Sequence, residues 1–84
     1  MVVEIFKTDV SDPGQAEALT KSLKPLAANG RVTFDLEDVD KILRTESDRG
    51  IAGQVIRLMV DSGFSCELLY SKETSRHETE RVPQ

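Results

Sequence analysis

The chain has 84 residues, of which 38% are hydrophobic and 31% are charged, and its formal net charge is −4. A chain of this length folds as one domain with a modest core, burying about 60% of the surface that its unfolded form exposes. The acidic balance and the scattered lysines and arginines argue against nucleic acid as a partner, since that requires a clustered positive surface.

The chain shows no sign of a membrane or secretory segment. No apolar stretch approaches the ~20 residues that span a bilayer, and no charged segment precedes an apolar one as in a signal peptide. The single cysteine, Cys66, excludes an internal disulfide and fits a reducing compartment. We therefore expect a cytoplasmic protein with no membrane partner.

The first thirty residues predict a strand followed by a helix. Residues 2–10 are rich in β-branched side chains, contain an aromatic and end at a turn signal, as strands do. Asp12 then suits the N-cap of a helix, Pro13 its first position and Gln15 the third residue of a capping box. Apolar residues follow at helical spacing until Pro25, which should end or kink the helix.

The rest of the chain predicts a hairpin, a second helix and a last strand. Residues 31–36 alternate strictly between apolar and polar side chains, which is typical of a half-buried strand, and residues 41–46 return as its partner. Residues 51–62 carry apolar side chains at helical spacing. Residues 64–70 alternate again and form the last strand.

This order, β-α-β-β-α-β, places the chain in the α+β class. Two helices on one face of a four-stranded antiparallel sheet form the ferredoxin-like arrangement. We expect residues 1–70 to form this domain. Residues 71–84 are polar and charged, and so predict a disordered C-terminal tail.

Two segments match a family pattern beyond the order of elements. "VTFDL" at residues 32–36 fits a V-x-V-D-L strand, and "GFSCEL" at residues 63–68 fits a G-[YF]-x-A-x-L motif. Leu19 and Leu23 fall on the apolar positions of the first helix. Over roughly Val2 to Tyr70 the chain thus resembles the heavy-metal-associated domain of copper chaperones and metal-transporting P-type ATPases.

The metal motif of that family, M-x-C-x-x-C, is absent. Val10, Asp12 and Gln15 stand where the family has its methionine and two cysteines. Soft Cu(I) is held by thiolates, which one carboxylate and a neutral amide do not replace. Asp12 and Gln15 are better explained as a helix cap than as ligands. The resemblance therefore does not carry copper or zinc delivery to these positions, and we expect no cofactor.

Cys66 is the alternative metal ligand or nucleophile. It alternates in register with Phe64 and Leu68, and the resemblance places an alanine at this position, so a small core residue is the preferred interpretation. The only histidine, His77, lies in the expected tail, which makes it a poor candidate for a catalytic base or a metal ligand. No catalytic constellation is visible, and we expect no enzymatic activity.

Acidic residues are expected to gather at one end of the domain. In this topology three loops meet there: the loop after the first strand, the hairpin loop and the loop after the second helix. Solvated turns favour such residues, but a docking patch for a basic partner would also use them. Weak binding of a hard cation such as Ca²⁺ is a lesser alternative. The expected acidic end comprises Asp9, Asp12, Glu37, Asp38, Asp40 and Asp61.

The sheet face away from the helices is the second candidate surface. Four apolar residues, Val3, Ile5, Ile42 and Leu69, are expected there among charged neighbours. Such a patch marks an interaction surface in some proteins, whereas scattered apolar residues are normal on others.

Three functions remain open on the sequence alone. The preferred one is a non-catalytic protein-interaction module that kept the heavy-metal-associated scaffold and lost its ligands, as a monomer or weak homodimer with a protein partner. The second is an atypical metal-binding or metal-transfer domain that uses Cys66 or the acidic loops. The third is a ligand-sensing ferredoxin-like module that dimerises across the open sheet face.

Overall fold

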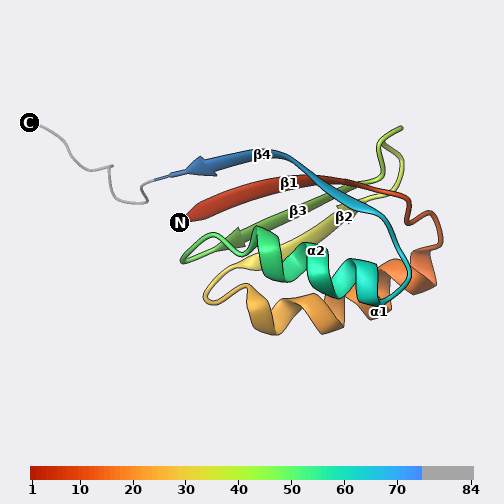
Figure 1. Ribbon diagram of the computed structural model, residues 1–84, viewed down its shortest axis with the longest axis horizontal. Coiled ribbons are helices and arrows are strands. Elements are labelled where there is room, and N and C mark those ends of the chain that lie inside the picture. The colour runs from red at the N-terminus through yellow and green to blue at the C-terminus, as the bar shows by residue number, and fades with distance from the viewer. Residues whose placement is uncertain (75–84) are drawn as a thin grey trace, which may run out of the picture.

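The computed structural model describes residues 1–74 as a sheet with helices packed on one of its faces (Figure 1). The elements are β1 (Val2–Thr8), α1 (Pro13–Leu23), the 3₁₀ helix η1 (Lys24–Leu26), β2 (Arg31–Asp35), β3 (Ile42–Ser47), α2 (Ala52–Asp61) and β4 (Cys66–Glu73). All strand pairs are antiparallel, and the strand order is β2-β3-β1-β4. The predicted α+β class, with four antiparallel strands and two helices, is confirmed.

Helix α1 begins and ends where the sequence predicts. The Asp12 side chain accepts a hydrogen bond from the Gln15 backbone N–H, at 2.9 Å, and Pro13 occupies the first helical turn. Pro has no N–H to donate, and the α-helix accordingly ends at Leu23 and continues as η1 around Pro25.

The core lies between the central strand β1 and the two helices. Phe6 of β1, Leu43 of β3 and Leu23 of α1 are fully buried, as are Val55 and Met59 of α2. Side chains from every layer therefore meet above the middle of the sheet. Burial of apolar surface in this layer is the main stabilising term for so small a domain.

Strand β4 contains a bulge. Phe6 lies opposite Leu68 but the preceding residue, Ile5, lies opposite Tyr70, so Leu69 is an extra residue on the β4 side. A bulge of this kind reverses the face on which the following residues of the strand lie. Tyr70 therefore shares the face of Ile5, away from the helices.

Strand β4 also extends beyond the expected domain boundary. Pairing with β1 continues to Glu73, and the Thr74 N–H then donates to the Met1 carbonyl at 2.7 Å. Placing the boundary after Tyr70 was therefore wrong, because pairing with a neighbouring strand orders polar residues that could not order themselves. The remainder of the expected tail, with His77, lies outside the described residues.

Candidate functional site

The three loops expected to meet do lie at one end of the sheet (Figure 1). The β2–β3 hairpin reaches β1 through the Asp40 carbonyl, which accepts the Thr8 N–H at 3.1 Å. The α2–β4 loop is held by Asp9, whose carboxylate accepts the Ser65 N–H at 2.9 Å. The end of β1 thus fixes the positions of both loops.

Most carboxylates of the acidic end also have a local structural partner. Asp12 caps α1, and Asp38 accepts the Asp40 N–H at 2.8 Å within the hairpin. Asp61 accepts a hydrogen bond from Arg57, at 3.2 Å, one helical turn earlier on α2, and the Asp40 carboxylate lies 3.9 Å from the Lys7 ammonium. These contacts hold the acidic groups in place without removing them from water.

Lys41, the cation next to Asp40 in sequence, is itself part of the hairpin. Its ammonium donates to the Leu36 carbonyl at 2.9 Å, and its own carbonyl accepts the Thr8 hydroxyl at 2.6 Å. Lys41 also adopts a positive φ of 48°. Its ammonium therefore helps to close the hairpin while keeping its charge. The acidic end has a negative balance because six carboxylates stand against the ammonium groups of Lys7 and Lys41.

The carboxylates are spread over the loops instead of converging. Within residues 1–74, no group of three or more His, Cys, Asp and Glu side chains is arranged to hold a metal ion. Hard cations such as Ca²⁺ take six to eight oxygen ligands around one centre.

Cys66 lies opposite Thr8 at the start of β4 and packs against the edge of the core. Its side chain is only partly exposed, and burial raises the pKa of the thiol to about 11. The thiolate is the form that binds metals and attacks electrophiles. At neutral pH Cys66 is therefore a protonated and poorly reactive group.

Three of the four apolar residues expected on the open sheet face, Val3, Ile5 and Ile42, share that face by the register of β1 and β3. The fourth, Leu69, is the extra residue of the bulge and has no register partner on β1. Val3 and Ile5 lie two residues apart on β1, and Ile42 lies opposite Lys7, next along that strand. The bulge places Tyr70 directly opposite Ile5. Charged residues that share this face by register are Lys7, Arg31, Asp35, Arg44, Glu46, Glu67 and Lys72.

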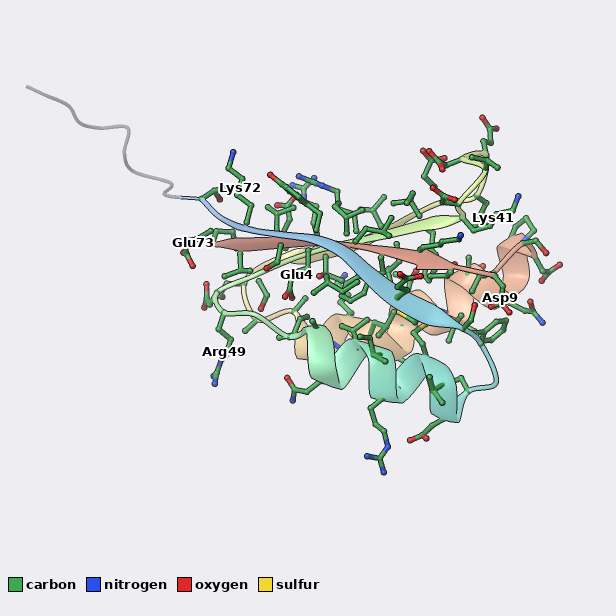
Figure 2. All side chains as sticks on the ribbon, turned by 45° about the horizontal axis from the view of Figure 1, so that its top comes forward. Glu4, Asp9, Lys41, Arg49, Lys72 and Glu73 are labelled. Atoms are coloured by element: carbon green, nitrogen blue, oxygen red, sulfur yellow. The ribbon has the colours of Figure 1, made fainter. Side chains whose placement is uncertain are left out.

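Glu4 is a buried carboxylate that the sequence analysis did not single out. It is 4% exposed and lies on the helix side of β1, next to the start of α2 (Figure 2). Its Oε1 accepts the Ile51 N–H at 2.8 Å, and Ser71 Oγ lies 3.4 Å from its Oε2. The residue before α2 is Ile51, which has no side-chain oxygen, so Glu4 supplies the missing cap.

Polar side chains surround Glu4 on the same layer. Thr45 lies directly opposite Glu4 on β3, and Ser47 lies opposite Val2. Both are essentially fully buried, and neither hydroxyl has a hydrogen-bond partner among residues 1–74. The alternation of β1 was the available signal, because it puts Glu4 on the same face as the buried Phe6.

The helix layer carries an open groove of about 670 Å³ that is lined by α2, the residue after it and Leu26 of η1. Leu26 of η1 and Leu58 of α2 contribute apolar side chains to the lining, and Arg57 and Asp61 contribute charged ones. None of the residues expected at the open sheet face lines it. Asp61 is the one residue of the expected acidic end that does so.

Comparison with protein-family models, with curated proteins and with solved structures found no match to this chain. Among the described residues, no helix has the length and apolar character needed to cross a membrane.

Proposed function

We propose that this chain is a non-catalytic protein-interaction module with a ferredoxin-like fold, related in scaffold to heavy-metal-associated domains but without their metal ligands. The strand order β2-β3-β1-β4 with two helices on one face supports the fold. The proposed relation to that family rests on the resemblance of the segments "VTFDL" and "GFSCEL" to the family's motifs.

The observation that carries the proposal is the structural commitment of the loop that follows β1. Asp12, at the position the resemblance gives to the first metal cysteine, accepts the N–H of Gln15, at the position of the second. The pair begins a helix. The only side-chain groups available to a metal at these two positions are therefore the neutral amide of Gln15 and the carboxylate of Asp12, which already accepts a hydrogen bond. Such a set has little affinity for a soft metal ion.

The partner that suits the acidic end is a basic protein surface. Carboxylates from three loops face solvent on one end of the domain, and the cations beside them, Lys7 and Lys41, are already engaged with Asp40 and with the hairpin. Clustered charges of one sign steer association with an oppositely charged partner and orient it. Binding through this end should therefore weaken as salt is added.

The test is NMR shift mapping of the full chain with a lysine-rich peptide as the probe. We expect shifts confined to the three loops and lost at high salt. Glu37→Lys should weaken binding, because Glu37 is exposed in the hairpin and its replacement breaks no cap. Glu73→Lys makes the same charge change at the opposite end of the molecule, where it removes one exposed contact with the Met1 ammonium, and serves as the control (Figure 2). Equal weakening by both variants would indicate a nonspecific charge effect and contradict the proposal.

The second arm of the test titrates the same sample with Cu(I) and with Zn²⁺. We expect no binding at the loop after β1. Micromolar or tighter binding that shifts Asp12 and its neighbours would contradict the module as proposed. Binding that disappears in Cys66→Ala would instead support the metal-handling alternative.

A further inference from the structure

Strand β4 is an uncovered edge of the sheet. It pairs with β1 on one side, and within residues 1–74 no strand pairs with its other side. An edge of this kind presents unpaired backbone N–H and C=O groups to any strand that reaches it. Three large apolar side chains in its middle are also exposed: Leu68 by 38%, Leu69 by 48% and Tyr70 by 50%.

The bulge gives this edge an internal symmetry. Side chains of a regular strand alternate between faces, so Glu67 and Lys72, five residues apart, would lie on opposite faces. Because Leu69 is an extra residue, both instead lie on the open face, Glu67 opposite Lys7 and Lys72 opposite Val3. An acidic and a basic residue thus flank the apolar centre of β4 on one face.

We propose that β4 pairs antiparallel with β4 of a second copy of this chain, about a two-fold axis between Leu69 and Tyr70. In this register Glu67 of each copy lies opposite Lys72 of the other, which gives two oppositely charged cross-strand pairs. Leu69 and Tyr70 of both copies meet at the axis. An isologous interface of this type closes as a dimer.

The remaining pairs of this register also agree in their faces. Leu68 lies opposite Ser71, and Cys66 opposite Glu73, and all four lie on the helix side of the sheet by their pairing with β1. Moving the register by one residue in either direction sets Leu68 opposite Tyr70 or Lys72, which lie on the other face. The bulge therefore selects this register over its neighbours.

The opposite edge, β2, is a weaker template for a second copy. Arg31 and Asp35 would also match in an antiparallel pair centred on Thr33, but β2 has five residues against the eight of β4. Its apolar residues Val32 and Phe34 pack against the core of their own domain. Pairing at β2 would therefore remove less apolar surface from water than pairing at β4.

The test is sedimentation equilibrium of the full chain from about 10 µM to about 1 mM, a range suited to a weak interface. We expect a reversible monomer–dimer equilibrium. Lys72→Glu should reduce the association constant about tenfold, because it sets Glu67 against a second carboxylate twice per dimer. The double variant E67K/K72E restores opposite charges and should restore association. Circular dichroism of each variant shows whether the monomer is folded.

Matched controls separate this interface from the alternatives. Arg31→Glu makes the same charge change at the β2 edge, and Ile42→Ser changes the open face on β3, with β1 between it and β4. Neither should alter association. A chain that stays monomeric at about 1 mM, a dimer that Lys72→Glu leaves intact, or one that Arg31→Glu or Ile42→Ser weakens as much would each overturn the inference. An E67K/K72E variant that does not regain the association of the parent chain would also overturn the inference. The inference does not depend on the acidic end, so either proposal can fail alone.

Discussion

Helices α1 and α2 begin in contrasting ways. The cap of α1 comes from Asp12, three residues before the N–H it accepts, and the bond is exposed. The cap of α2 comes from Glu4, 47 residues before the N–H of Ile51, and the bond is buried. The first contact stabilises one helix locally. The second ties α2 to the central strand, so it contributes to the tertiary structure as well as to the helix.

The largest effect is expected from Glu4→Ala. It removes the acceptor of a buried N–H and leaves Ile51 without a partner, which should lower the free energy of unfolding by about 2–3 kcal/mol. Glu4→Gln is the matched control, since its amide oxygen can still accept that N–H, and less than half of the loss is expected. Urea unfolding followed by circular dichroism measures both, because the chain has no tryptophan. A Glu4→Ala protein as stable as the parent would show that this cap is dispensable.

Asp12→Ala tests the local cap. The expected loss is about 1 kcal/mol, the usual cost of removing an N-cap side chain at a helix start. Asp12→Asn keeps an acceptor oxygen and should change stability by only a few tenths of a kcal/mol. The same denaturation experiment applies. If Asp12→Ala costs more than Glu4→Ala, the ranking of local and long-range caps is reversed.

Thr45→Val tests whether the Thr45 hydroxyl, beside Glu4, contributes to the free energy of unfolding. The Thr45 hydroxyl is fully buried and has no hydrogen-bond partner among the described residues. Replacing it with a methyl group of similar size should raise the free energy of unfolding by about 0.5–1 kcal/mol. A loss of stability on this substitution would mean that the hydroxyl contributes to the polar layer around Glu4.

The smallest effect is expected from Ser71→Ala. Ser71 Oγ lies 3.4 Å from Glu4 Oε2, near the limit of a hydrogen bond, and the carboxylate keeps its contact with Ile51. The free energy of unfolding should therefore fall by no more than about 0.5 kcal/mol. Hydrogen exchange at the Ile51 amide should stay close to that of the parent. Faster exchange there would assign Ser71 a part in orienting Glu4.

The same contrast explains what could be predicted from the sequence. Asp12, Pro13 and Pro25 act on neighbours within a few residues, so the start and end of α1 followed from local rules. The start of α2 lies beside Gly50 and Ile51, whose side chains cannot accept a hydrogen bond. The acceptor for the Ile51 N–H is Glu4, which lies on β1. Glu4 was recognisable only through the alternation of β1, which implies a carboxylate facing the core.

The acidic end and the β4 edge likewise differ in how far they could be predicted from the sequence. The position of the acidic loops followed from the order of the elements, since this order brings three loops to one end. The bulge in β4 did not, because Leu69, Tyr70 and their neighbours contain no glycine or proline to mark it. It changes which of them shares a face with Ile5, and with that the symmetry of the whole edge.

The central position of β1 has a consequence for the order of folding. Both neighbours of β1 in the sheet come from much later in the chain, since β3 begins at Ile42 and β4 at Cys66. The chain must close long loops before either pair forms, and such non-local contacts slow folding. Helix α1 has its cap from the outset, whereas α2 gains Glu4 only after β1 docks. The two helices should therefore mature at different times, with α2 waiting for the sheet.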